Sequence, residues 1–139
     1  MKVFITGVGG LLGSTLAKYL INKNIPVVGV DNFIGGLKEN IPEGIEFHEL
    51  DVLDVEAVKN AMKDCDTVFH AAALPYEGLS VFSPKLCVES IVSGTVSVAS
   101  AAVSNNIRLF INCSSMARYG NQVPPFVESM TPKPVDPYG

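Results

Sequence analysis

The 139-residue sequence contains no tryptophan, only two histidines and few charged residues, which make up 17% of the chain. Its 10 Lys and Arg residues are scattered and outnumbered by 14 Asp and Glu, which gives a net charge of −4. Nucleic-acid binding needs clustered positive charge, so we expect no nucleic-acid partner. Because His48 and His70 have no companion His or Cys at ligand spacing, we also expect no metal site, and we assign His70 to the core as a hydrogen-bonded residue.

Cysteine is scarce as well. Cys65, Cys87 and Cys113 are odd in number, widely spaced and embedded in apolar stretches. This pattern is typical of buried, reduced thiols rather than of a disulfide framework. The sequence also shows no signal peptide and no run that approaches the roughly 20 apolar residues of a membrane-spanning helix. We therefore expect a soluble, cytoplasmic protein without a membrane partner.

Apolar side chains are abundant: 47% of the residues are hydrophobic and the mean hydropathy is +0.31. A chain of this length can bury about two thirds of its unfolded surface, which is enough for one domain with its own core. The low charge content is unusual for a self-contained soluble domain. We therefore expect residues 1–139 to form one incomplete domain, with part of the apolar surface belonging against a further region.

Short apolar runs alternate with segments of helical periodicity along the whole chain. Such alternation predicts a doubly wound α/β fold of the Rossmann type, in which helices cover both faces of a parallel sheet. We expect the strand order 3-2-1-4-5 with right-handed crossovers, in a sheet truncated before a sixth strand. The predicted strands are Lys2–Thr6, Pro26–Asp31, Ile45–Glu49, Thr67–His70 and Leu109–Cys113.

Three segments carry helix signals. Apolar residues recur at helical spacing from Leu11 to Ile21, Asp54 is suited to cap a second helix, and Pro84 suits the first turn of a long helix that reaches about Asn105. Residues 114–139 hold five of the nine prolines and should form a loop over the carboxyl ends of the strands. The side chains expected to face the core are Val55, Val58 and Met62 in the second helix, and Leu86, Ile91, Val98 and Val103 in the long helix.

The turn after the first predicted strand has the glycine pattern of a dinucleotide-binding turn. Gly7 permits the tight turn, Gly10 lets the backbone approach a pyrophosphate, and Gly13 lets the helix pack closely on the strand. The helix then starts with Leu11 and Leu12, whose N–H groups would face the phosphates. The position between a strand and an amphipathic helix favours this interpretation over a purely structural glycine turn.

Asp31, at the end of the second predicted strand, is placed with Asn32 to bind the ribose of such a cofactor. Its charge would repel a 2′-phosphate, and neither Asn32 nor Phe33 supplies the arginine that accepts one. We therefore predict NAD rather than NADP. Asp51 and Val52, just past the third strand, are placed to meet the adenine, although Asp51 is alternatively a solvated turn residue.

Six motifs follow one another along the chain: Thr6–Gly13, Asp31-Asn32, Val68–Ala73, Gly94-Thr95, Ser114–Gly120 and Pro137–Gly139. Together they resemble the extended short-chain dehydrogenase/reductase family, and within it the NAD-dependent nucleotide-sugar epimerases and dehydratases. Six ordered motifs are far more specific than a glycine turn alone. The resemblance spans the whole chain and implies further cofactor contacts along Ala71, Ala72 and Ala73.

The resemblance also implies a catalytic serine at Ser115 and a catalytic tyrosine at Tyr138. A phenol with its ordinary pKa near 10 is a poor base at neutral pH, and the family places a lysine four residues after the tyrosine to lower that pKa. This lysine would be residue 142, and the region that binds the sugar nucleotide would also lie beyond residue 139. We expect this amino-terminal fragment to bind NAD but to show negligible turnover by itself.

Three places depart from the family pattern. Ser90-Ile91 stands where the family usually has an asparagine near the cofactor. Met116 and Ala117 replace the Asp-Glu pair of sugar dehydratases, and because neither side chain can move a proton, dehydration is disfavoured. Arg118 replaces a residue that is more often small and apolar, and it is either a solvated loop charge or a contact to a substrate phosphate.

The function implied by the resemblance is a nucleotide-sugar epimerase, in which Tyr138 takes a proton from a sugar hydroxyl while hydride passes to the nicotinamide and later returns. The alternatives are a one-way oxidoreductase of the same family and a non-catalytic dinucleotide-binding regulator. The resemblance also implies a homodimer for the intact protein. We further expect self-association through the fifth strand, where Leu109, Phe110 and Ile111 are short of cover.

Overall fold

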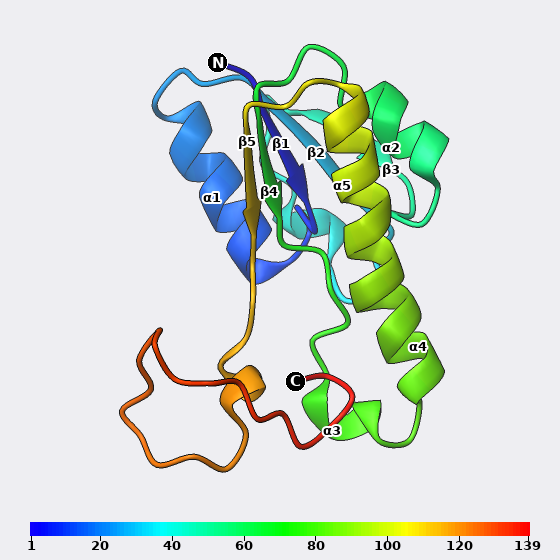
Figure 1. Ribbon diagram of the computed structural model, residues 1–139. Coiled ribbons are helices and arrows are strands. Elements are labelled where there is room, and N and C mark those ends of the chain that lie inside the picture. Colours follow the sequence, from blue (N-terminus) through cyan, green and yellow to red (C-terminus); the bar gives the residue numbers. More distant parts are fainter.

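The structure, a computed structural model, describes all residues from 1 to 139. Five parallel strands form one sheet in the order β3-β2-β1-β4-β5 (Figure 1). The predicted strand order and doubly wound architecture are confirmed, and each strand begins and ends within one residue of its predicted bounds. The strands are β1 (Val3–Thr6), β2 (Val27–Asp31), β3 (Glu46–Glu49), β4 (Thr67–His70) and β5 (Leu109–Asn112).

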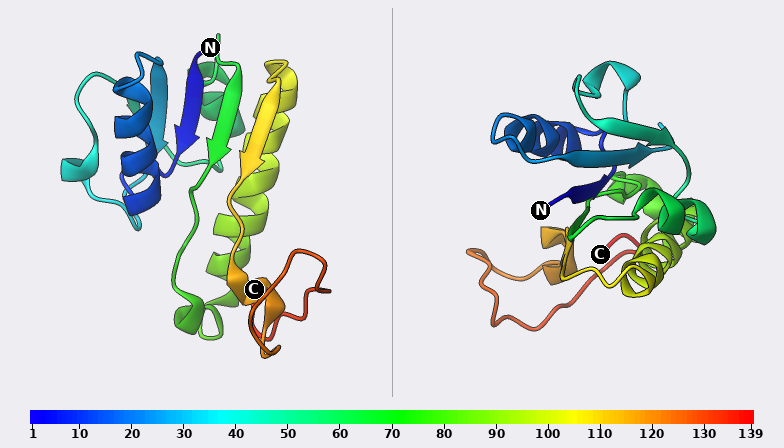
Figure 2. Two further views of the ribbon diagram at one scale, coloured as in Figure 1. Left: turned by 90° about the vertical axis from the view of Figure 1, so that its left-hand side faces the viewer. Right: turned by 90° about the horizontal axis from the view of Figure 1, so that it is seen from above.

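Helices cover both faces of the sheet. α1 (Leu11–Ile21) lies on one face, whereas α2 (Val55–Ala61) and a long helix lie on the other (Figures 1 and 2). Asp54 caps α2 as predicted, because its side chain accepts a hydrogen bond from the N–H of Ala57 at 3.0 Å. Shorter elements are η1 (Lys38–Asn40), α3 (Glu77–Ser80) and η3 (Met116–Tyr119).

The sheet divides the apolar core into two clusters. Successive residues of a strand point to opposite faces, so Phe4 packs on the side of α2 while Val3 and Ile5 pack under α1. β1 and β2 are buried along their whole length, as central strands of a parallel sheet must be. The larger cluster holds Phe4, Val28, Val30, Val58, Met62, Cys65, Val68, Val98, Ala101 and Ala102, and the smaller holds Val3, Ile5, Val8, Ala17, Leu20 and Val27.

One continuous helix runs from Pro84 to Ser104, with Asn105 at its C-cap, close to the predicted end. It consists of α4 (Pro84–Val88), a π turn labelled η2 (Glu89–Ser93) and α5 (Gly94–Ser104). The π turn was not expected from the sequence. It changes the direction in which the side chains of α4 point relative to those of α5.

Two residues of this helix do not face the core as predicted. Val98 is buried, but Val103 follows it by five residues, which places it about 140° around the helix, and it is 80% exposed. Leu86 is 46% exposed because it lies beyond the sheet, at the edge of a pocket. The residues that complete the inner face, Ala101 and Ala102, are small enough for the helix to approach the sheet closely.

The segment 84–104 also corrects the expectation that no stretch approaches a spanning helix. Its most apolar 18-residue stretch has a mean hydropathy of 1.6, so by length and composition alone the helix could cross a membrane, and 33% of that stretch is buried within the fold. The inner face belongs to the larger core cluster. The outer face carries a stripe of exposed valines at spacings of four, namely Val88, Val92 and Val96, which are 45%, 55% and 60% exposed.

Expected burial also fails at two other positions. Cys65 and Cys87 are buried free thiols as predicted, but Cys113 is exposed, because it follows the edge strand β5 out of the sheet. Val55 opens α2 and is 37% exposed, whereas Val58, one turn later, is fully buried. Both errors arise at the ends of elements, where an apolar residue leaves the packed face.

The α1 face of β4 and β5 has no helix over it (Figure 2). Phe69 and Ile111 are paired in register there, and Leu109 is 45% exposed, as predicted for this strand. Phe110 points to the other face and packs against the larger cluster, so the expectation that it lacks cover is wrong. Residues 113–139 continue from β5 as the predicted loop at the carboxyl ends of the strands (Figure 1).

We predict that Gly13→Ala lowers the free energy of unfolding by about 1–3 kcal/mol. The added Cβ would overlap the carbonyl oxygen of Gly7, so the backbone of α1 would have to move away from β1. Urea unfolding followed by circular dichroism measures the change. Gly78→Ala is the control, because a Cβ there meets no atom within 4 Å. Equal losses in the two variants would contradict the close packing of α1.

Candidate functional site

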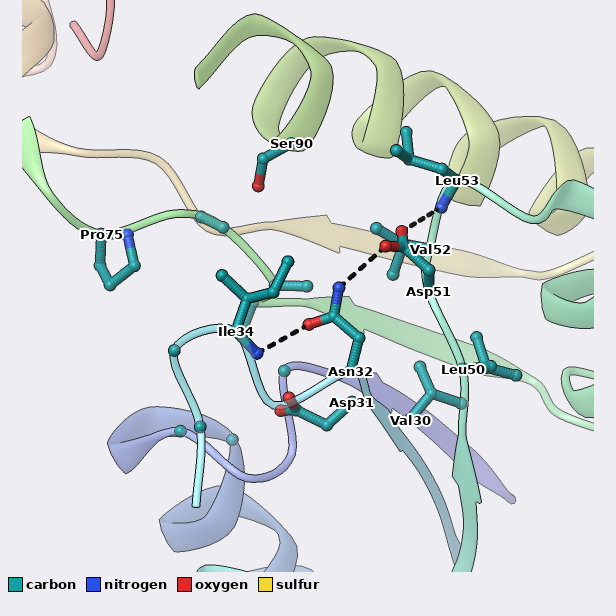
Figure 3. Close-up of a pocket in the computed structure, with 18 of the residues that line it drawn as sticks. Val30, Asp31, Asn32, Ile34, Leu50, Asp51, Val52, Leu53, Pro75 and Ser90 are labelled. Carbon is teal, nitrogen blue, oxygen red and sulfur yellow. Dashed lines mark hydrogen bonds between the residues drawn. The ribbon is translucent and has the colours of Figure 1, made fainter. Parts of the chain in front are cut away.

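A pocket of about 430 Å³ lies at the carboxyl ends of β1, β2, β3 and β4, beside the start of the long helix (Figure 3). This edge of an open parallel sheet, where the crossovers change direction, is where α/β proteins bind ligands. The structure brings together at this edge all the residues predicted for the cofactor. The predicted residues that line it are Gly7, Gly10, Leu11, Leu12, Gly13, Asp31, Asn32, Asp51, Val52, Ala71, Ala72 and Ala73.

The floor of the pocket is a turn that only glycine can build. Gly7 has a φ of +72°, and a Cβ there would lie 2.8 Å from the backbone nitrogen of Ala72. α1 then begins after Gly10, which has no side chain to cap the helix, and its first turn holds no acidic residue. The N–H groups of that turn have no intrahelical acceptor. The turn therefore fits the diphosphate of a dinucleotide, which would accept these hydrogen bonds.

Asp31 is held in a fixed orientation at the end of β2. Its Oδ2 accepts a hydrogen bond from the N–H of Gly9 at 2.8 Å, and its Oδ1 accepts one from the N–H of Phe33, also at 2.8 Å. The residue is 8% exposed, and Gly36 passes directly over it, since a Cβ on Gly36 would lie 3.0 Å from Oδ2. Each carboxylate oxygen keeps a free lone pair, which suits the two neighbouring hydroxyls of a ribose.

Asn32 and Asp51 join the loops that follow β2 and β3. The Asn32 amide donates to Asp51 Oδ2 at 2.9 Å, and Asp51 Oδ1 accepts the N–H of Leu53 at 2.8 Å (Figure 3). Asn32 also accepts the N–H of Ile34 at 3.1 Å. These side-chain to backbone bonds shape the turns, so Asp51 is a pocket residue engaged with the protein and not a freely solvated one.

His70 lies behind the pocket, at the end of β4, and is the hydrogen-bonded core residue that the sequence predicted. Its ring nitrogens lie 2.8 Å from Thr6 Oγ1 and 3.0 Å from Thr95 Oγ1. Thr6 Oγ1 also accepts the N–H groups of Ala71 and Ala72. Burial lowers the pKa of His70 to about 4, because the charged imidazolium is disfavoured away from water.

A known protein family matches almost the whole chain. Residues 3–139 match the family described as NAD dependent epimerase/dehydratase. The chain belongs to this family. The UDP-glucose 4-epimerase of Streptomyces lividans is 30% identical over 142 residues, which represent 99% of this chain and 43% of that protein.

Solved epimerase structures agree with the fold of this family member. The UDP-glucose 4-epimerase of Thermotoga maritima, crystallised with UDP-glucose, has a TM-score of 0.95 at 28% identity and covers 100% of this chain and 47% of that one. The enzyme of Thermus thermophilus in complex with NAD has a TM-score of 0.93 at 29% identity, over 99% and 46% of the two chains. The chain therefore spans less than half the length of these relatives.

Ser115 and Tyr138 lie outside the pocket, in the segment after β5. These are the two residues to which the epimerase/dehydratase resemblance assigns catalysis. Ser115 precedes η3, and its Oγ accepts a hydrogen bond from the N–H of Ala117 at 3.2 Å. Tyr138 is next to the same turn, since a Cβ on the neighbouring Gly139 would lie 2.7 Å from the carbonyl oxygen of Ala117. The structure thus gathers the two residues at one turn, and their roles stay predictions.

Arg118 is not free in solvent. Its guanidinium lies over the ring of Tyr119, 4.9 Å from the centroid, and Tyr119 in turn stacks on Phe126 at 5.0 Å. Its Nε is buried and has no hydrogen-bond partner. The loop therefore holds this cation in place through the aromatic pair.

Sequence reasoning missed one wall of the pocket. Gly35 and Gly36 follow Asp31 closely, and this glycine pair is a signal that could have been used. The remaining residues come from the loop after β4 and from the long helix, and no local motif marks them. Those that the sequence did not indicate are Pro75, Leu86 and Glu89, whereas Ser90 occupies the position where the family usually has an asparagine. Val30, Ile34, Leu50 and Leu53, which adjoin predicted residues at the ends of β2 and β3, were also not predicted.

We predict that the burial of His70 makes the protein less stable in acid. Its folded pKa of about 4 lies below the ordinary 6.5, so between these values the unfolded chain binds a proton that the folded chain does not. The stability that the neutral His70 contributes to the folded protein is fully present above pH 6.5. As the pH falls toward 4, the free energy of unfolding decreases by about 1.4 kcal/mol per pH unit and by about 3 kcal/mol in all.

Urea unfolding at several pH values between 4 and 7 measures this slope. His70→Gln should reduce the slope of the unfolding free energy with pH by up to the equivalent of one bound proton. His48→Gln, at an exposed position on β3, should keep the part of the slope that comes from His70. The lowered pKa values of Glu46 and Asp66 act in the same direction and are shared by the wild type and His70→Gln, so these two proteins give the decisive comparison. His48→Gln also removes the imidazole that helps to lower the pKa of Glu46, so its slope can fall slightly for that separate reason. An unchanged slope in His70→Gln would show that the folded protein protonates this imidazole freely.

Proposed function

We propose that residues 1–139 form the cofactor-binding part of an NAD-dependent nucleotide-sugar epimerase. One observation carries the proposal: the uncapped first turn of α1 and the carboxylate of Asp31 lie on the same pocket at the carboxyl edge of the sheet. The first offers donors for a diphosphate, and the second offers acceptors for ribose hydroxyls. Membership of the NAD-dependent epimerase/dehydratase family supports it.

The pocket favours NAD over NADP. A 2′-phosphate would lie against the Asp31 carboxylate, which the N–H groups of Gly9 and Phe33 hold in place. No lysine or arginine lines the pocket to offset that repulsion. The adenine would lie against Asp51 and Val52, and the rest of the dinucleotide would run past Ala71, Ala72 and Ala73 toward the Ser115 turn.

In this proposal the intact protein oxidises a sugar reversibly, and residues 1–139 supply the cofactor pocket, Ser115 and Tyr138. NAD, when bound, supplies the hydride acceptor and donor. Tyr138 takes the proton of a sugar hydroxyl, and Ser115 donates a hydrogen bond to the same oxygen. Met116 and Ala117 leave no acid or base for elimination, which favours epimerisation over dehydration. UDP-sugar epimerases among the relatives make a nucleotide sugar the proposed substrate. The family lysine would be residue 142, so we expect residues 1–139 alone to bind cofactor without turnover.

We further propose a soluble, cytoplasmic protein that acts as a homodimer and binds neither nucleic acid nor membrane. The free thiols of all three cysteines support a cytoplasmic location. The scattered positive charge supports the absence of a nucleic-acid partner. The exposed stripe of Val88, Val92 and Val96 supports dimerisation, because an apolar helix face of this kind is stabilised by burial against a second copy.

We predict that this chain binds NAD and that Asp31→Ala weakens the binding at least tenfold, which corresponds to about 1.4 kcal/mol. The variant removes the charged acceptor of the ribose hydroxyls. Calorimetric titration with NAD measures the affinity, with Glu56→Ala, an exposed carboxylate of α2 outside the pocket, as the control. Titration with NADP should show weaker binding to the wild type. Equal affinity of the wild type and Asp31→Ala for NAD would contradict the proposed site.

We also predict that the wild-type chain sediments as a dimer at micromolar concentration and that Val92→Asp produces monomers. A charge in the middle of the valine stripe would have to be buried without a partner in the dimer. Leu109→Asp places the same charge on the open face of β5. Comparing the two variants shows whether the valine stripe or β5 forms the contact. Sedimentation velocity distinguishes them: a wild-type monomer excludes dimerisation of residues 1–139 through the valine stripe, and dissociation by Leu109→Asp alone assigns the contact to β5.

A further inference from the structure

A buried chain of hydrogen bonds joins the end of β1 to the long helix, directly behind the pocket. Thr6 and His70 are paired residues of β1 and β4 and are 0% and 3% exposed. Thr6 Oγ1 lies 2.8 Å from His70 Nδ1, and His70 Nε2 lies 3.0 Å from Thr95 Oγ1. The Thr95 hydroxyl also donates to the carbonyl oxygen of Ile91 at 2.6 Å. Both nitrogens of the imidazole are therefore engaged within the protein.

The direction of each hydrogen bond follows from the donors and acceptors available. Thr6 Oγ1 accepts the N–H groups of Ala71 and Ala72 at 3.1 and 3.0 Å. A hydroxyl oxygen has two lone pairs and one hydrogen, so only the hydrogen is left for His70. Nδ1 must then be the acceptor, and the proton of the neutral ring is on Nε2, which donates it to Thr95. A protonated Nδ1 would find no lone pair on Thr6.

The chain of hydrogen bonds ends on the π turn of the long helix. The N–H of Gly94 bonds to the carbonyl of Glu89, five residues earlier, and this wide turn reduces the rotation per residue below the 100° of an α-helix. Leu86 and Ser90 line the pocket, and a Cβ on Gly94 would lie 3.0 Å from Cγ2 of the pocket residue Val52. Leu86, Ser90 and Gly94 are four residues apart and all face the pocket side. In a regular α-helix, each step of four residues would turn the side chain about 40° further from that side.

We propose that His70, held as the Nε2–H tautomer, is a positioning residue for the dinucleotide site. It ties the π turn to the strand ends, so that the hydroxyl of Ser90, which points into the pocket (Figure 3), is held at a fixed distance from Ala71 and Ala72. Ser90 then gives the cofactor a polar contact from the helix side, where the sequence lacks the asparagine of its family. The inference rests on the proposed function, because NAD is the ligand that this arrangement serves.

Thr95→Val tests the coupling between the hydrogen-bond chain and the pocket. Valine has nearly the shape of threonine, but it neither accepts from His70 nor donates to Ile91. We expect NAD to bind Thr95→Val roughly fivefold to tenfold more weakly than the wild type. Thr95→Ser keeps the hydroxyl and should bind within about twofold of the wild type. Calorimetric titrations are made well below the unfolding temperature of each variant, which thermal unfolding establishes first.

The tautomer is a second readout, and general destabilisation does not move it. In His48→Gln, His70 is the only imidazole of the chain, so nitrogen-15 spectra report on it alone. We expect a protonated Nε2 and an unprotonated Nδ1 in this background and in the double variant with Thr95→Ser. Adding Thr95→Val removes the acceptor of Nε2–H, and the spectrum should shift toward a mixture of tautomers.

Each result decides a separate point. A protonated Nδ1 in the His48→Gln background would overturn the assigned hydrogen-bond direction. Wild-type NAD affinity in Thr95→Val would overturn the positioning role while leaving the proposed function intact. A wild-type chain that does not bind NAD at all would refute the proposed function and the positioning role together, whereas the tautomer would still be read from the spectrum.

Discussion

The backbone of Gly7 lies so close to that of Ala72 that a Cβ on Gly7 would be 2.8 Å from the Ala72 nitrogen. The start of α1 lies so close to the carbonyl oxygen of Gly7 that a Cβ on Gly13 would overlap it. These contacts set the distances between β1, β4 and the first helix. They leave the N–H groups of the helix pointing into the pocket, and they bring Thr6 within reach of two further N–H groups after β4. The geometry of the pocket therefore depends on two positions at which a Cβ atom cannot be accommodated.

The fold could be predicted from the sequence because its signals are local. Every strand except β3 is a short, mainly apolar run that ends at a polar residue, and Asp54 and Pro84 mark the starts of two helices. β3 (Glu46–Glu49) has only one apolar residue and is the weakest of these signals. Burial was less predictable, because it depends on what lies opposite. Val103 has the same chemistry as Val98 but lies on the outer face of the helix, and Cys113 leaves the sheet one residue after β5 ends.

Half of the site could be predicted for a similar reason. The glycine turn follows β1 directly and Asp31 ends β2, and these are neighbouring parallel strands whose carboxyl ends lie at the same edge of the sheet. Locating the two strands in the sequence therefore also places the turn and Asp31 together, as their hydrogen bond shows. Pro75 lies in the loop after β4 and Glu89 in the π turn, and the course of these two segments brings both residues to the pocket. No residue pattern in the sequence predicts that course. The hydrogen bonds of His70 join residues 64 and 25 positions apart, and only the folded chain shows that they meet.

The uncovered face of β4 and β5 has a consequence for how a reaction centre could assemble. Phe69 and Ile111 present a small apolar surface that ends at the Ser115 turn, three residues beyond β5. A segment that packs on this surface arrives beside Ser115 as it excludes water from the two strands. If Ser115 has the role proposed for it, completion of the hydrophobic layer and alignment of the reacting groups would then be one cooperative event.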